Sequence, residues 1–264
     1  MEHLYLENFI NGEFVATEQH LDSYDPSTGE VWAKIPDSGE KEVGLAVDAA
    51  KRAFELWSCT PVAERSKIMN KIADILESQL EEFAKMESRD QGKPVSLAMM
   101  VDIPRAVYNF RVFASSILNI VTDCTILDDR GCLNYSLRSP VGVAGLISPW
   151  NLPLYLLTFK IAPCIATGNT CVCKPSEMTS VTAWMLGKVL NEAGLPPGVV
   201  NIVFGTGPKA GSVLVSHPDV PLISFTGSTL TAEKIRKDSA PFCKKLSLEV
   251  NWFIMLLITL SVSS

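Results

Sequence analysis

Two short loops bring together residue types that bind phosphate and sugar groups. Residues 225–228 read Phe-Thr-Gly-Ser, where Gly227 would let a phosphate approach the backbone and Ser228 offers a hydroxyl donor. Residues 174–177 read Lys-Pro-Ser-Glu, and a carboxylate such as Glu177 after a strand commonly accepts hydrogen bonds from ribose hydroxyls. Together the two loops predict a binding site for a dinucleotide.

A third loop, residues 204–207, is a glycine-rich turn with the sequence Phe-Gly-Thr-Gly. The chain has no Gly-x-Gly-x-x-Gly motif, so the usual dinucleotide fingerprint of a Rossmann fold is absent. The glycines would also serve ordinary turns. From the residues alone, a nucleotide-binding α/β domain is favoured and the plain-turn interpretation stays open.

These loops recur because short apolar strands alternate with helical segments from Pro140 onward. The predicted strands are 141–147, 170–173, 199–204, 222–225 and 244–248. The predicted helices between them are 153–167, 179–193, 209–216 and 229–237. This alternation is typical of a Rossmann-like parallel five-stranded sheet with flanking helices, in which ligands bind at the carboxyl ends of the strands.

The rest of the chain divides around this α/β core, residues 140–249. Residues 1–118, the N-terminal part of the predicted NAD-binding domain, are expected to be mainly helical after a short extended start, in which Asn11-Gly12 marks a hairpin turn. One long predicted helix has Pro61 at its first helical position and carries an apolar stripe from Ile68 to Phe83. Residues 119–139 alternate apolar and polar side chains around a turn and predict a projecting β-hairpin arm for oligomerisation. A divergent apolar tail occupies residues 250–264.

Composition excludes several classes of function. The formal net charge of −6, without a Lys/Arg cluster, argues against a nucleic-acid partner. The acidic N-terminus does not resemble a secretory signal, and the tail's apolar run from Trp252 to Val262 is too short to span a membrane. The 7 cysteines lack metal-ligand spacing, and Cys171 and Cys173 fit a buried strand, so we expect no metal and a reducing, cytoplasmic location.

Four motifs occur in the order and at the spacing typical of the aldehyde dehydrogenase superfamily. They are Pro-Trp-Asn at 149–151, Lys-Pro-Ser-Glu at 174–177, Phe-Thr-Gly-Ser at 225–228 and Leu-Ser-Leu-Glu at 246–249. The chain resembles this family from about Leu6 to Glu249. Residues 141–158 look most like the branch that oxidises a semialdehyde of tryptophan catabolism.

The resemblance implies NAD as the cofactor and assigns roles to individual residues. Asn151 would hold the aldehyde oxygen through its side-chain amide, and Glu249 would be the general base that activates water. A carboxylate at Glu177 disfavours the additional phosphate of NADP. The implied cofactor-binding residues are Ile147, Ser148, Pro149, Trp150, Lys174, Ser176, Glu177, Gly207, Phe225, Gly227 and Ser228.

The family reaction also needs a cysteine nucleophile, which in the family follows the general base by several tens of residues. Here the composition changes after Glu249, and the family's Gly-Gly-Lys is replaced by Val250-Asn251-Trp252. Cys243 precedes Glu249 by 6 residues, and nothing in the sequence marks it as activated. We therefore expect a truncated chain that is inactive by itself.

Other functions remain open beside this one. The chain could be a non-catalytic NAD-binding protein that forms homo-oligomers or joins full-length subunits in mixed oligomers. Use of the apolar tail as a membrane anchor is a weaker alternative. An unrelated Rossmann reductase would need a Tyr-x-x-x-Lys motif, and Tyr155 and Lys160 are 5 positions apart.

Overall fold

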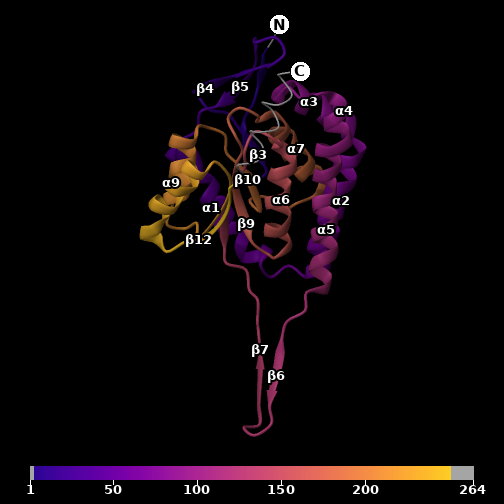
Figure 1. The fold of residues 1–264 in the computed structure, drawn as a ribbon, viewed down its shortest axis with the longest axis vertical. Helices are drawn as coiled ribbons and strands as arrows, with labels where there is room; N and C mark the ends of the chain where they lie inside the picture. The colour runs from indigo at the N-terminus through magenta and orange to yellow at the C-terminus, as the bar shows by residue number, and fades with distance from the viewer. Residues whose placement is uncertain (1–2, 251–264) are drawn as a thin grey trace.

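A seven-stranded sheet forms the centre of the computed structural model, which describes residues 3–250 (Figure 1). Its strands are, in spatial order, β12 (Lys245–Val250), β11 (Leu222–Gly227), β8 (Val143–Ile147), β9 (Thr170–Lys174), β10 (Val200–Ile202), β2 (Asn8–Ile10) and β3 (Glu13–Val15). Neighbours from β12 to β10 pair in parallel, which confirms the five-stranded parallel sheet expected from the sequence. Every residue of β8 and β9 is buried, as expected where helices cover both faces.

The sheet continues beyond the predicted strands through the N-terminal hairpin. Asn11 and Gly12 adopt φ angles of 54° and 79°, which confirms the tight turn predicted between β2 and β3. Strand β2 pairs antiparallel with β10, with Phe9 opposite Ile202. This pairing covers the free edge of the short strand β10. The sequence predicted the hairpin but gave no signal for its partner.

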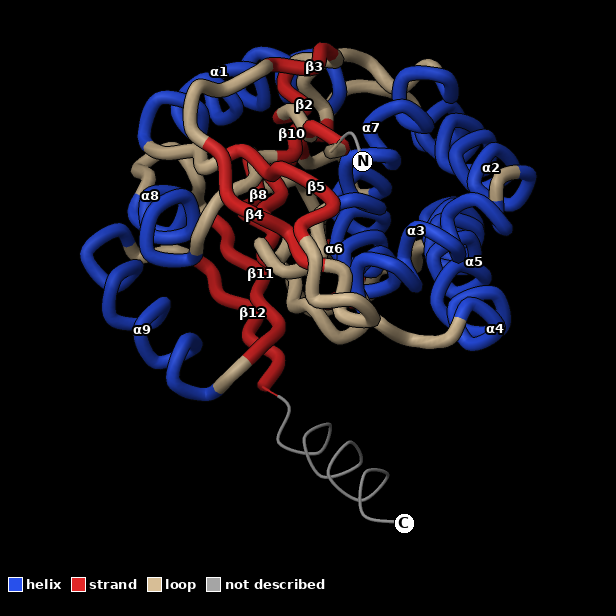
Figure 2. Tube along the Cα trace, turned by 90° about the horizontal axis from the view of Figure 1, so that it is seen from above, coloured by secondary structure: helices blue, strands red, loops and turns tan. Residues whose placement is uncertain are grey.

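Helices cover both faces of the sheet (Figure 2). One face packs against α1 (Glu40–Trp57), α8 (Ser212–Ser216) and α9 (Thr229–Ser239). The other face packs against α6 (Pro153–Ala166) and α7 (Val181–Ala193). An outer layer on that second side contains α2 (Val62–Ser78), α3 (Leu80–Gln91) and α5 (Ile103–Ser116). The short segments are α4 (Val95–Leu97), π-helix η1 (Ala98–Asp102), 3-10 helix η2 (Ile117–Asn119), π-helix η3 (Gly207–Gly211) and 3-10 helix η4 (Ala240–Phe242).

The outer helices differ from the sequence prediction in two details. The apolar stripe from Ile68 to Phe83 predicted one long helix, whereas the chain breaks at Gln79 into α2 and α3. Pro61 is the N-cap of α2 rather than its first helical residue, because its ψ of 141° is extended. A small separate sheet of β1 (Leu4–Tyr5), β5 (Val31–Pro36) and β4 (His20–Tyr24) lies beside this layer.

The hairpin arm extends away from the body of the molecule (Figure 1). Its strands β6 (Cys124–Leu127) and β7 (Cys132–Tyr135) pair only with each other within the described residues. The predicted tail lies outside the described residues from position 251 onward. Among the helices within residues 3–250, none combines the length and apolar character needed to cross a membrane.

Candidate functional site

A cavity of about 400 Å³ lies at the carboxyl ends of β8, β9 and β11. All of the cofactor-binding residues predicted from the sequence line it, from Ile147 to Ser228. The structure adds lining residues that the motifs did not include: Pro208, Gly211, Ser212, Val215, Thr226, Thr231, Lys234, Ile235 and Asp238. Loops that are far apart in the sequence therefore line one cavity, as a parallel sheet predicts.

A carboxylate is held in its charged form at this cavity. Nζ of Lys174 lies 2.8 Å from Oε2 of Glu177, and the lysine side chain is buried whereas the glutamate is 37% exposed. Burial opposes the charge of Glu177, but Lys174 and the backbone N–H groups of Glu177 and Gly207 outweigh it and lower its pKa. The exposed part of this carboxylate can accept hydrogen bonds from the hydroxyls of a sugar.

Gly227 keeps the backbone at the end of β11 close to an aromatic ring. A Cβ atom at this position would lie 2.5 Å from Cζ of Phe225, so a larger residue would displace the ring. Both residues line the cavity. The glycine therefore has a steric role here, and its missing side chain leaves the backbone open toward the cavity.

The next residue, Ser228, begins helix α9. Its Oγ accepts a hydrogen bond from the backbone N–H of Thr231 at 3.3 Å and lies 2.9 Å from Oγ1 of the same threonine. The sequence predicted a hydroxyl that binds phosphate, and the structure gives this hydroxyl a capping role as well. A helix N-terminus lined by Gly227, Ser228 and Thr231 favours an anionic group.

The fit to a dinucleotide can be tested on polar atoms that the protein leaves without a partner. Oγ of Ser148 is buried at the cavity and has no hydrogen-bond partner among the described residues. No atom of the described chain lies within 4 Å of a Cβ built on Gly207. An acceptor for sugar, a helix N-terminus for phosphate and an unpaired hydroxyl fit the parts of NAD.

Glu249 does not line this cavity but a second one, of about 350 Å³, on the α6 side of the sheet. Its Oε2 accepts a hydrogen bond of 3.2 Å from Oγ1 of Thr226, and Thr226 itself lines the first cavity. The pair connects the two cavities through neighbouring strands, because Thr226 and Glu249 are register partners.

Lys160 also lines the second cavity. The sequence interpretation did not include this lysine among the site residues. Its Nζ donates a hydrogen bond of 3.0 Å to Oγ of Ser224. Burial lowers the pKa of Lys160 to about 8, against the opposing effect of Glu249. The available signal was a lysine within the otherwise apolar helix 153–166.

Asn151 lies between β8 and α6, directly after Trp150 of the first cavity. Its Oδ1 is buried and has no hydrogen-bond partner among the described residues. Asparagine amides in proteins are normally paired when buried. The N-cap of α6 is Leu152, so Asn151 does not cap this helix, and its Oδ1 stays without a partner in the described chain.

No cysteine of the described chain lines the first cavity. Cys164 lines the second cavity, but the hydrogen bond with Cys171 and burial raise its pKa well above the ordinary value. Activation would require a lower pKa. Cys243 is exposed on the short turn before β12, and Cys124 and Cys132 lie in the arm. Within residues 3–250, no cluster of His, Cys, Asp or Glu is placed to hold a metal.

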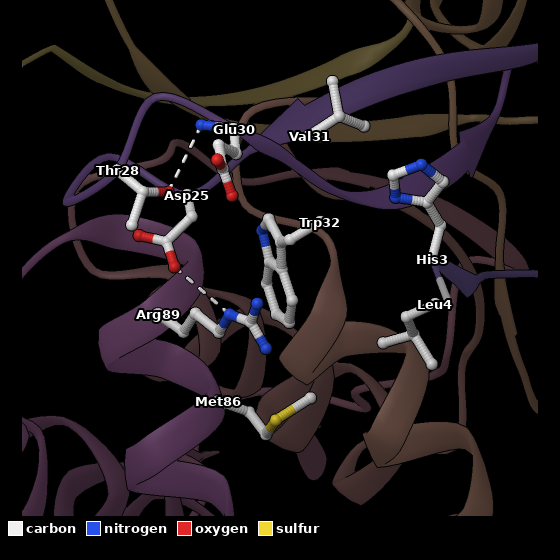
Figure 3. Close-up of a pocket in the computed structure, with 9 residues that line it drawn as sticks. All are labelled: His3, Leu4, Asp25, Thr28, Glu30, Val31, Trp32, Met86 and Arg89. Atoms are coloured by element: carbon white, nitrogen blue, oxygen red, sulfur yellow. Dashed lines mark hydrogen bonds and ion pairs between the residues drawn. The ribbon is translucent and has the colours of Figure 1, made fainter. Parts of the chain in front are cut away.

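A larger cavity, of about 690 Å³, lies elsewhere, between β5 and α3 (Figure 3). There the guanidinium of Arg89 stacks over Trp32 at 4.6 Å and binds the carboxylate of Asp25 at 3.1 Å. Arg89 and Asp25 pair with each other there, and no glycine lines this cavity, in contrast to the first one. Size alone therefore does not identify the site.

The sheet order and the cavity at its carboxyl edge define a nucleotide-binding α/β protein. The aldehyde dehydrogenase family model matches residues 14–251. The chain is 66% identical over 250 residues to 2-aminomuconic semialdehyde dehydrogenase of Danio rerio, covering 95% of this chain and 51% of that protein. It is 63% identical over 247 residues to the Homo sapiens protein of the same name, covering 94% and 51%.

Solved structures agree with these matches. An NAD+ complex of an aldehyde dehydrogenase from Bacillus cereus superimposes with a TM-score of 0.91 at 39% identity, covering 94% of this chain and 51% of that one. The chain belongs to the aldehyde dehydrogenase family. It spans about half the length of the curated relatives that it matches.

Proposed function

We propose that this chain forms the NAD-binding half of an aldehyde dehydrogenase. The observation that carries the proposal is a single cavity lined by every cofactor-binding residue that the sequence suggested. Glu177 would accept the hydroxyls of the adenosine ribose, with Lys174 beside it. The N-terminus of α9 and Gly227 would face the pyrophosphate.

Bound NAD supplies an acceptor for the hydride that leaves an aldehyde. In this proposal the Asn151 amide donates a hydrogen bond to the aldehyde oxygen, which stabilises negative charge as it develops there. Glu249 takes a proton from water, and Thr226 holds its carboxylate in place. A cysteine nucleophile is required in addition, and among the described residues no cysteine lines the first cavity.

The proposed substrate is an aldehyde that also carries a carboxylate, namely 2-aminomuconate semialdehyde of tryptophan catabolism. The names of the vertebrate relatives and of a bacterial 2-hydroxymuconic semialdehyde dehydrogenase, 44% identical, support this substrate class.

For the 264-residue chain alone we propose NAD binding without aldehyde oxidation, in the cytoplasm and as a homo-oligomer. The alternative function is a non-catalytic subunit in mixed oligomers with full-length relatives. The exposed apolar side chains of the arm favour assembly of either kind.

The experiment is an NAD titration of the purified chain by isothermal calorimetry, followed by an assay for NAD reduction with a muconic semialdehyde. We expect saturable binding of NAD, weaker binding of NADP, and no turnover. Absence of NAD binding by a folded chain would contradict the cofactor proposal, and turnover at the rate of a full-length relative would contradict the inactivity proposal.

A further inference from the structure

Three charged side chains are buried together beside the loop that carries Asn151. Nζ of Lys93 lies 2.9 Å from Oδ2 of Asp102, and their side chains are 7% and 1% exposed. Glu87 is also buried, and burial raises its pKa to about 7 while Lys93 acts in the opposite direction. These residues come from α3, from the turn that follows it, and from the end of π-helix η1.

The cluster binds the backbone between β8 and α6 at two points. Lys93 Nζ donates a hydrogen bond of 3.3 Å to the carbonyl oxygen of Asn151. Oε1 of Glu87 accepts one of 3.3 Å from the backbone N–H of Leu154, and its Oε2 accepts one of 2.6 Å from Thr182. The backbone on both sides of Asn151 and Pro153 is thus fixed by side chains from the outer helical layer.

Stability alone is a poor explanation for this arrangement. Removing two charges from water costs several kcal/mol per ion, and well-packed apolar residues would be at least as stable in many proteins. The cost is incompletely offset here, because Oδ1 of Asp102 is buried without a partner among the described residues. The ion pair does, however, orient a lysine that reaches the peptide group of Asn151.

We propose that Lys93 is a positioning residue that fixes the side-chain amide of Asn151 by holding the carbonyl oxygen of the same residue. Asp102 orients the lysine, and Glu87 holds the far end of the turn at Leu154. The statement that this amide binds an aldehyde oxygen rests on the proposed function. The statement that Lys93 fixes the geometry of Asn151 is independent of it. Lys93 itself need not touch the substrate.

The experiment uses the 264-residue chain labelled with ¹⁵N-asparagine, in which the Asn151 side-chain resonances are identified by their loss in Asn151→Ala. In the unsubstituted chain we expect one narrow pair of Asn151 amide resonances. In Lys93→Met/Asp102→Asn, which removes both charges together, we expect these resonances to shift and broaden. In a second sample, labelled with ¹⁵N-leucine, exchange of the Leu154 backbone amide should accelerate roughly tenfold. The resonances of Asn70, in α2, should stay unchanged.

Two controls separate positioning from general stability. Arg111→Met removes an exposed ion pair with Asp74 and should leave Asn151 unchanged. Lys93→Arg keeps the charge and a donor and should restore most of the native spectrum. Unchanged Asn151 resonances in the folded double variant would overturn the proposal. If that variant does not fold, multiple or broad Asn151 resonances in the unsubstituted chain would overturn it equally.

An NAD titration of the same samples keeps this result apart from the proposed function. If the unsubstituted chain does not bind NAD, but the double variant still loses the Asn151 geometry, only the cofactor proposal is contradicted. If the unsubstituted chain binds NAD, and the double variant keeps the Asn151 geometry without Lys93, only the positioning role is contradicted.

Discussion

Lys174 and Glu177 form an ion pair of 2.8 Å, in which the lysine is buried and the carboxylate reaches the cavity. The lysine helps to keep the glutamate charged, and both residues line the same cavity. A phosphate on the ribose would meet the carboxylate with like charge. One pair of residues can therefore provide both affinity for NAD and discrimination against NADP.

Glu177→Gln should weaken NAD binding roughly 10- to 150-fold, because a hydrogen bond to a charged acceptor contributes roughly 1.5–3 kcal/mol. It should also narrow the preference for NAD over NADP, since the repulsive charge is gone. Calorimetric titration with each nucleotide measures both effects. Glu192→Gln, at an exposed position in α7, is the matched control and should bind NAD normally. Equal NAD affinity in the two variants would refute the assignment.

Gly227→Ala should abolish measurable NAD binding while the chain stays folded. The added Cβ would lie 2.5 Å from Cζ of Phe225, and displacement of that ring would fill part of the cavity. The control is Gly44→Ala in helix α1, where nothing lies within 4 Å of an added Cβ and alanine favours the helix. We expect that control to bind NAD fully and to melt at the same or a higher temperature.

The residues that were predictable from the sequence are those whose role depends on local geometry. A strand, a glycine and a helix start are neighbours in the chain, so the loops around Gly227 and Glu177 could be assigned before the fold was known. Lys160 and Lys93 could not, because their partners Ser224 and Asn151 are distant in sequence. The apolar helix around Lys160 is a local sign of burial, but no local pattern identifies the distant partner of either lysine.

In the fold, too, local features were predictable and contacts between distant residues were not. Alternating apolar strands and helices predict the parallel sheet, since each strand must be covered on both faces. The break at Gln79 was not predictable, because the apolar stripe continues through it in register. The pairing of β2 with β10 depends on a contact between Phe9 and Ile202, far apart in the chain.

Glu87→Gln should change how stability depends on pH. The folded pKa of Glu87 is raised to about 7 from an ordinary 4.5, mainly by burial, so the folded chain binds more protons than the unfolded chain between these values. Stability from this group is present below pH 4.5 and is lost as pH rises toward 7. The loss is on the order of 3 kcal/mol.

The neutral glutamine should remove most of that loss, and urea unfolding across this pH range measures it. The pKa of Asp90 is raised to about 6, also mainly by burial. Asp90 therefore contributes a similar decrease of stability with rising pH, which should persist in the variant. The difference between the two curves therefore reports Glu87 alone. Parallel curves would show that the Glu87 carboxyl titrates normally in the folded chain.

Charges on one face of the arm should disrupt assembly. Ile126 and Leu133 are register partners on the hairpin and are 68% and 59% exposed, a state that an apolar pair rarely keeps unless it is covered by a partner. Ile126→Glu/Leu133→Glu should convert the proposed homo-oligomer to monomers in size-exclusion chromatography with light scattering. The neighbouring pair Thr125 and Asn134 points to the opposite face.

Thr125→Glu/Asn134→Glu adds the same charge to the same arm and is the matched control. If the apolar face forms the contact, this control stays oligomeric and still joins a tagged full-length relative on co-expression, while the first variant does neither. Loss of assembly in both variants would indicate that hairpin charge in general, rather than the Ile126–Leu133 face, controls association. Retention in both would exclude the arm as the contact.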